Sequence, residues 1–187
     1  MRVLLIDNAS QHIEKLADLF KGHHLTVIPY GLIGEYNADL YDLIVLSGGG
    51  RHSLIGNRHL FKKEMEFINK TDKPVIGICF GFELLAYIHG VRIRKLKEKI
   101  QGFQTVDVID STLKSRLGGN ILVYEGHSWY ISHCPDELIP LITSPSGIEA
   151  FKHTTKPHYG MQFHPEVTYE SDEGKQVFEY IFSQITS

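Results

Sequence analysis

The sequence predicts a single α/β domain, spanning residues 1–187, built on a doubly wound and mostly parallel sheet. Three observations support this fold class. The length of 187 residues fits one domain of ordinary size. Short apolar runs alternate with amphipathic stretches over the first 90 residues. Those apolar runs lack a period of two, which is typical of parallel strands covered on both faces.

The first half of the chain alternates between strand and helix patterns. Residues 10–20 carry apolar side chains at positions 13, 16, 17 and 20, which is helical spacing. We expect Ser10 to cap this helix and Gly22 to end it, and Gly90 to end the third helix. The expected strands are 2–7, 25–29, 41–50 and 73–78, and the expected helices are 10–20, 59–70 and 81–90.

The pattern changes after Gly90, where strands follow one another through turns and part of the sheet becomes antiparallel. A helix over 171–185, capped by Ser171 or Asp172, closes the chain. No linker or internal repeat divides the sequence. The expected strands of this half are 91–96, 103–110, 120–127, 148–153 and 158–163.

Charge and cysteine content exclude several functional classes. The net charge is −3, without a basic stripe or an acidic tail, so we expect neither nucleic acid nor a membrane as a partner. The two cysteines suggest no disulfide framework, and we expect a cytoplasmic protein. No C-x-x-C or H-x-x-x-H spacing is present, so no metal or other cofactor is expected.

The stretch "GICFG" places Cys79 between Gly77 and Gly81, directly after a predicted strand and before a predicted helix. This is the spacing of a nucleophile elbow, with cysteine in place of serine. The N-terminus of the following helix favours a thiolate. An inert buried cysteine beside a tight turn is the alternative.

A thiolate nucleophile needs a base, and His164 is the candidate because Glu166 follows two residues later. On an extended chain these two side chains point to the same side, so the carboxylate can orient the imidazole. The glycines of "LSGGG" end another strand and can present N–H groups to an anion. Gly49 and Phe80 are the candidate donors of an oxyanion hole.

The motifs "LSGG", "GICFG" and "GMQFHPEV", in this order, resemble the class I glutamine amidotransferase domain over nearly the whole chain. The resemblance implies a flavodoxin-like fold, a triad of Cys79, His164 and Glu166, and oxyanion donors at Gly49 and Phe80. It also implies hydrolysis of glutamine through a cysteine thioester, with ammonia passed to a partner synthetase.

The C-terminal stretch is similar to the separate glutaminase subunit of archaeal GMP synthase. Two positions depart from that branch. "CFGFE" places Glu83 where the family usually has glutamine, as in γ-glutamyl hydrolases. His127, Ser128 and Trp129 are similar to the His-Ser-Leu of anthranilate and aminodeoxychorismate synthase subunits, where these residues contact substrate.

Three functions therefore stay open: a glutaminase subunit that feeds a separate synthetase, a stand-alone γ-glutamyl hydrolase, and a catalytically silent relative that binds or regulates. An ammonia-donating subunit should dock through the surface around Cys79. The candidate contacts are residues 51–58 and 127–134, and we expect Trp129 to be at least partly exposed.

Overall fold

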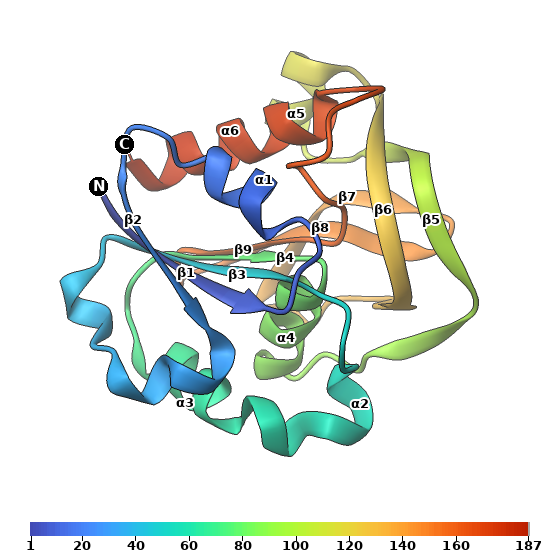
Figure 1. Ribbon diagram of the computed structural model, residues 1–187. Coiled ribbons are helices and arrows are strands. Elements are labelled where there is room, and N and C mark those ends of the chain that lie inside the picture. The colour runs from blue at the N-terminus through green and yellow to red at the C-terminus, as the bar shows by residue number, and fades with distance from the viewer. Residues whose placement is uncertain (187) are drawn as a thin grey trace.

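A computed structural model describes residues 1–186 as one nine-stranded sheet between two layers of helices (Figure 1). The strand order is β2-β1-β3-β4-β9-β8-β7-β5-β6. The strands β2-β1-β3-β4-β9 are parallel to one another, and their order along the sheet is the flavodoxin-like arrangement. This confirms the predicted fold class. In Figure 1, α1, α5 and α6 lie on one side of the sheet, and α2, α3 and α4 on the other.

The bounds of the elements follow. The strands are β1 Arg2–Asn8, β2 His24–Pro29, β3 Leu43–Gly49, β4 Val75–Ile78, β5 Arg94–Val108, β6 Asn120–Tyr130, β7 Leu138–Ser144, β8 Gly147–His153 and β9 His158–Met161. The α-helices are α1 Ile13–Asp18, α2 Leu54–Asn57, α3 Lys62–Lys70, α4 Phe80–Ile88, α5 Ser111–Leu117 and α6 Glu173–Thr186. Three 3₁₀ segments are Tyr30–Glu35, Ala38–Leu40 and Arg58–Phe61.

The parallel half matches the expected elements closely because its inner strands β1, β3 and β4 are buried on both faces. Leu43, Ile44, Val45 and Leu46 of β3, for example, are fully buried. Two hydrophobic clusters fill the space between the sheet and its helix layers, one on each side. Burial of these apolar side chains drives the packing of the helices onto the sheet.

The expected cap of the first helix is wrong. The helix begins at Ile13, its N-cap residue is His12, and no side chain caps it. Ser10 instead accepts a hydrogen bond from the His12 N–H (3.1 Å), while its own N–H donates to Asp7 (2.9 Å). These bonds close a local turn, so the Ser10 hydroxyl is used in the turn and is not available to cap the helix. The predicted helix over 10–20 is therefore reduced to six residues.

The antiparallel half differs most from expectation. The two strands expected at 91–96 and 103–110 are one strand, β5, which is irregular between Lys95 and Ile100 where it pairs with β6. The structure adds β7 and α5, which were not expected. Among residues 1–186, no helix is both long enough and apolar enough to cross a membrane.

The three segments that carry the candidate site residues, 47–50, 77–83 and 163–166, lie at neighbouring strand ends. β3, β4 and β9 are adjacent and parallel, so their carboxyl ends meet at one edge of the sheet. Residues 47–50 and 77–83 span the ends of β3 and β4, and residues 163–166 come shortly after the end of β9. In open α/β sheets this edge is where ligands bind.

Candidate active site

Cys79 stands on a strained turn between β4 and α4. Its backbone has φ 49° and ψ −102°, a region that non-glycine residues rarely adopt. The Cys79 N–H donates to the Met161 carbonyl (2.7 Å), and the Cys79 carbonyl accepts from the Glu83 N–H (3.0 Å). The turn is thereby tied to β9 on one side and to the first turn of α4 on the other. Strain of this kind is typical of functional positions.

The glycines on both sides of Cys79 are required by space. A Cβ atom at Gly77 would collide with the backbone of Gly81, and one at Gly81 would collide with the carbonyl of Leu46 on β3. The helix can therefore start directly against the sheet only when both positions lack side chains. This explains the spacing of the motif in physical terms.

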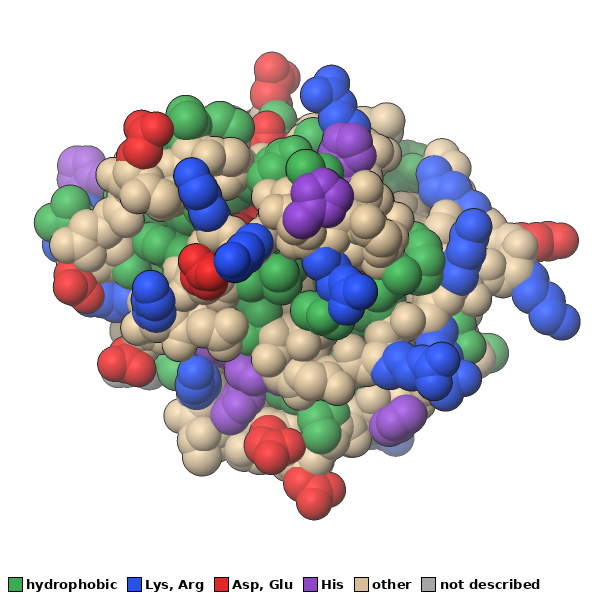
Figure 2. All heavy atoms as spheres, turned by 90° about the horizontal axis from the view of Figure 1, so that it is seen from below, with side chains coloured by type: hydrophobic (Ala, Val, Ile, Leu, Met, Phe, Trp, Pro, Cys, Tyr) green, Lys and Arg blue, Asp and Glu red, His purple; other side chains and the backbone are tan. Residues whose placement is uncertain are grey.

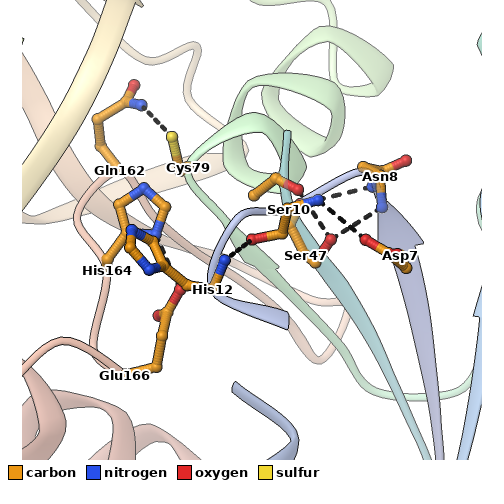
Figure 3. A network of polar contacts seen from close by, with 10 residues as sticks. Asp7, Asn8, Ser10, His12, Ser47, Cys79, Gln162, His164 and Glu166 are labelled. Carbon is orange, nitrogen blue, oxygen red and sulfur yellow. Dashed lines mark hydrogen bonds and ion pairs between the residues drawn. The ribbon is translucent and has the colours of Figure 1, made fainter. Parts of the chain in front are cut away.

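His164 and Glu166 lie next to this turn, as the sequence suggested. The His164 Nδ1 and the Glu166 Oε1 are 2.8 Å apart, and both side chains are nearly buried. The His164 N–H donates to the Tyr124 carbonyl of β6 (2.8 Å), which holds the backbone of the loop. The other side of the imidazole faces the Cys79 side chain (Figure 3).

The pKa of His164 is raised well above its ordinary value. Burial alone would lower it, but the charge and hydrogen bond of Cys79, together with those of Glu166, outweigh burial. A histidine in this state is protonated near neutral pH. It can stabilise a neighbouring thiolate and can donate a proton to a leaving group.

Gly48 and Gly49, at the end of β3, pack tightly against these groups. A Cβ atom at Gly48 would lie 2.9 Å from the His164 Cε1. One at Gly49 would lie 2.9 Å from the Asn8 carbonyl and 3.0 Å from the Phe80 ring. The glycines thus let the backbone approach the space above Cys79. Phe80 is in the first helical turn, whose N–H groups have no partner within the helix.

Seven of the nine predicted site residues line one cavity of about 240 Å³: Gly49, Cys79, Phe80, Glu83, His127, Ser128 and Trp129. His164 lines an adjoining cavity of about 140 Å³, which shares Gly49, Gly50, Lys99 and Gly126 with the first. Glu166 lies behind His164. Trp129 is partly exposed, as expected.

Glu83 is a buried carboxyl group in the wall of the cavity, with 4% of its surface exposed. Burial raises its pKa to about 7, and this rise is opposed by the charge of His127 and by a hydrogen bond from Gln162. The Gln162 Nε2 also points at the Cys79 Sγ, at 3.9 Å (Figure 3). The Gln162 amide therefore reaches the thiol, and it also favours the ionised form of Glu83.

The His127 side chain is held by the protein itself. Its Nδ1 bonds to the Trp129 carbonyl (2.7 Å), and its Nε2 lies 3.0 Å from the Glu125 Oε2. Burial lowers its pKa, but Glu125 and Glu149 outweigh this and raise it. Since both ring nitrogens are engaged within the protein, the His127 ring is held in one orientation in the cavity wall.

Glu125, His127 and Glu149 are the residues in the described range that could hold a metal ion. Their ligand atoms lie within 4.8 Å of one another, and one oxygen of each glutamate has no hydrogen-bond partner. Burial and the charge of Glu125 raise the pKa of Glu149 to about 7, so a proton can take the place of a cation here.

Sequence reasoning missed several residues of the site. Gln162 stands two residues before His164, so strand alternation could have placed the two side chains together. Lys99 comes from the irregular part of β5, and no sequence pattern indicates that it reaches the cavity. His12 and Tyr124 pack edge-on against the His164 ring, with centroids 5.3 and 6.1 Å away.

Comparison with known proteins identifies the family. The family model "Glutamine amidotransferase class-I" matches residues 4–184. A glutamine-hydrolysing GMP synthase subunit of Methanothermobacter thermautotrophicus is 33% identical over 74% of this chain and 72% of its own length. Its counterpart in Methanobrevibacter smithii is 29% identical over 97% of this chain and 95% of its own length.

Two solved structures are similar to this chain over its whole length. A Thermoplasma acidophilum protein described as a GMP synthase subunit has a TM-score of 0.86 at 25% identity, covering 100% of this chain and 94% of its own. A Thermotoga maritima glutamine amidotransferase has a TM-score of 0.73 at 22% identity, covering 100% of this chain and 84% of its own, and shows the same fold. The chain belongs to the glutamine amidotransferase class-I family.

Proposed function

We propose that this protein hydrolyses the side-chain amide of glutamine through a thioester on Cys79 and passes the ammonia to a separate synthetase, with the GMP synthase reaction as the leading candidate. One observation carries the proposal. Cys79, on its strained turn at the cavity wall, faces His164 (Figure 3), which Glu166 holds from the other side at 2.8 Å. This is the order of nucleophile, base and orienting carboxylate.

In the first half of the reaction, the Cys79 sulfur attacks the amide carbon of glutamine, and its proton resides on His164. The carbonyl oxygen becomes an oxyanion, and in this proposal the N–H groups of Gly49 and Phe80 donate hydrogen bonds to it. When the C–N bond breaks, His164 gives its proton to the nitrogen, so ammonia leaves as a neutral molecule. The acyl group stays on sulfur as a thioester.

In the second half, a water molecule attacks the thioester carbon and His164 takes a proton from it. The C–S bond breaks, glutamate leaves, and the Cys79–His164 pair is restored. Glu166 keeps the imidazole in one orientation throughout and stabilises its charged form. The raised pKa of His164 supports the acid role in the first half.

A separate synthetase as partner is supported by the names of the relatives, which are individual subunits of glutamine-hydrolysing GMP synthases. The ammonia formed at Cys79 would then be consumed on another polypeptide. We infer the same division of labour here.

A stand-alone γ-glutamyl hydrolase is the second candidate, and Glu83 is the observation that favours it. A buried carboxyl in the cavity wall accepts hydrogen bonds from an ammonium or amide group, and in its ionised form it cannot donate one. It would bind the α-amino group of the substrate and repel a carboxylate. Glu83→Gln then changes the choice among γ-glutamyl substrates.

The test combines covalent labelling with two substrates. The protein and Cys79→Ala are incubated with a glutamine-like diazo-ketone and analysed by intact mass, while parallel reactions contain glutamine or a γ-glutamyl dipeptide. Labelling of the wild type alone, with ammonia released from glutamine, is expected. Dipeptide cleavage that Cys79→Ala loses would favour the hydrolase. Neither labelling nor hydrolysis, with a synthetase present, would indicate a silent relative.

A further inference from the structure

Positive charge is concentrated in two segments that are far apart in the sequence. Residues 51–63 contain four Lys and Arg residues and no Asp or Glu. Residues 92–99 contain five Lys and Arg residues and one Glu. The two segments therefore hold nine of the 19 basic residues of the chain but one of its 22 acidic residues. The whole chain carries a net charge of −3, so the asymmetry is local.

All nine basic side chains of these segments are exposed. Among the described residues, the ion pair that they make is Lys62 with Glu66, at 3.8 Å. Arg58 donates a hydrogen bond to the Tyr87 hydroxyl (2.9 Å) and lies over its ring. The other cations have no partner in the part of the chain that the structure describes. Unneutralised charge of one sign makes the electrostatic potential positive over this part of the surface.

The two segments border the cavity of Cys79. Ser53, from the first segment, and Lys99, from the second, both line it. Lys95 is paired in the β5–β6 ladder with Trp129, which also lines the cavity and is partly exposed. We call residues 51–63 and 92–99 the basic rim. Figure 2 views the side of α2 and α3, and Lys and Arg side chains gather on its right-hand part, where β5 lies in Figure 1.

We propose that the basic rim is the docking face for an acidic surface of the synthetase that consumes the ammonia. The inference rests on the proposed function, because a synthetase is needed as partner only if ammonia is formed in the cavity between the two segments. A partner seated on both segments would cover the cavity and receive ammonia directly from it. Complementary charge would also speed and orient the encounter.

A protein fits this surface better than a nucleic acid. Apolar side chains interrupt both segments, and Leu60 is 37% exposed within the first. Partly exposed Tyr87 and Trp129 lie beside the cations. Aromatic groups set among Arg side chains are typical of protein interfaces. The negative charge of the rest of the chain opposes binding to a polyphosphate.

The test is charge reversal with a matched control. Arg94→Glu combined with Lys97→Glu changes the rim at two exposed residues that do not line the cavity. Lys114→Glu combined with Lys175→Glu makes the same charge change on α5 and α6, on the other side of the sheet. The probe is the purified synthetase subunit of the same organism, and its Kd is measured at low and high NaCl.

We expect the rim variant to weaken binding about tenfold or more at low salt, with a smaller salt dependence, while the control stays within about twofold. Cys79 labelling and glutamine hydrolysis without the synthetase should be unchanged in both variants. Equal affinities for the two variants would overturn the inference, as would absence of binding by the wild type. So would tighter binding of a single-stranded RNA 20-mer that the rim variant loses.

The outcomes separate this inference from the proposed function. If glutamine is hydrolysed and Cys79 is labelled, yet charge reversal leaves synthetase binding unchanged, the docking face is wrong and the chemistry stands. If no hydrolysis occurs with or without synthetase, the proposed function itself fails.

Discussion

Cys79 shows how a single residue depends on its neighbours for a conformation that it could not hold alone. Its positive φ angle costs about 1–3 kcal/mol of backbone strain in general. Gly77 and Gly81 leave the space that makes the turn possible, and hydrogen bonds to Met161 and Glu83 tie it in place. The motif could be recognised in the sequence because its glycines are required by contact rather than by flexibility.

Replacing Gly81 with alanine should destabilise the protein. The added Cβ would collide with the Leu46 carbonyl, and a strand backbone cannot move aside cheaply. We expect a loss of about 2 kcal/mol or more in the free energy of unfolding, measured by urea titration. Gly31→Ala is the control, since open space surrounds that position, and it should stay within about 0.5 kcal/mol. Equal midpoints for the two variants would contradict the collision.

Glu83 marks the limit of prediction at the residue scale. The sequence identifies its position in the motif, but not that its carboxyl is buried beside Gln162 and His127 with a pKa of about 7. Those neighbours are distant in the chain, since Gln162 directly follows β9 and His127 belongs to β6. Lys99 was missed for the same reason, because its place at the cavity depends on the path of an irregular strand.

At the scale of elements, the parallel half could be predicted and the antiparallel half only in part. The strands β1, β3 and β4 are continuous apolar runs, so they are visible in the sequence. β7 was missed because Pro140 interrupts it, and the structure accommodates the proline where the register shifts next to Ile142. α5 was missed although Asp110 caps it by accepting bonds from Thr112 and Leu113. That cap was an available signal.

Two histidines are paired where the end of α4 meets the start of β9. The His89 Nε2, just after α4, lies 3.0 Å from the His158 Nδ1, at the start of β9. Burial and the charges of neighbouring histidines and Lys156 lower the pKa of His89 to about 4 and that of His158 to about 3. Both side chains are therefore neutral in the folded protein near pH 7.

This pair predicts a loss of stability in mild acid. Between about pH 6.5 and pH 4 the unfolded chain binds protons at these histidines and the folded chain does not, so the contribution of this pair to stability falls as pH decreases. The raised pKa values of the buried Glu64, Glu83 and Glu149 act in the opposite direction, so the test compares the wild type with His89→Gln, which cannot titrate. From pH 7 to pH 4 the urea midpoint of the wild type should fall relative to that of the variant. An unchanged pH slope in the variant would exclude the pair as its source.

At the scale of the whole molecule, the parallel and antiparallel halves share one sheet. β9 pairs with β4 on one side and with β8 on the other, so it joins the two halves directly. The site is built across this junction. Cys79 comes from the parallel half, while Glu125, His127 and the lining residues of β6 come from the antiparallel half.

A joined sheet predicts one cooperative unfolding transition. Trp129, the single tryptophan, lies in β6 and reports on the antiparallel half by fluorescence. Far-ultraviolet circular dichroism reports on the helices that cover the parallel half as well. The two probes should give the same urea midpoint. Separate midpoints would mean that residues 1–187 form more than one folding unit.

Because β9 lies between the two halves, the site can be completed only late in the synthesis of the chain. A ribosome releases the Cys79 turn early, when β1, β3 and β4 can already assemble, but the loop with His164 and Glu166 follows more than 80 residues later. Until β9 inserts, Cys79 has neither its imidazole partner nor the backbone bond to Met161. On the proposed mechanism, the nascent chain therefore carries the thiol without its base, and hydrolysis can begin only after β9 enters the sheet.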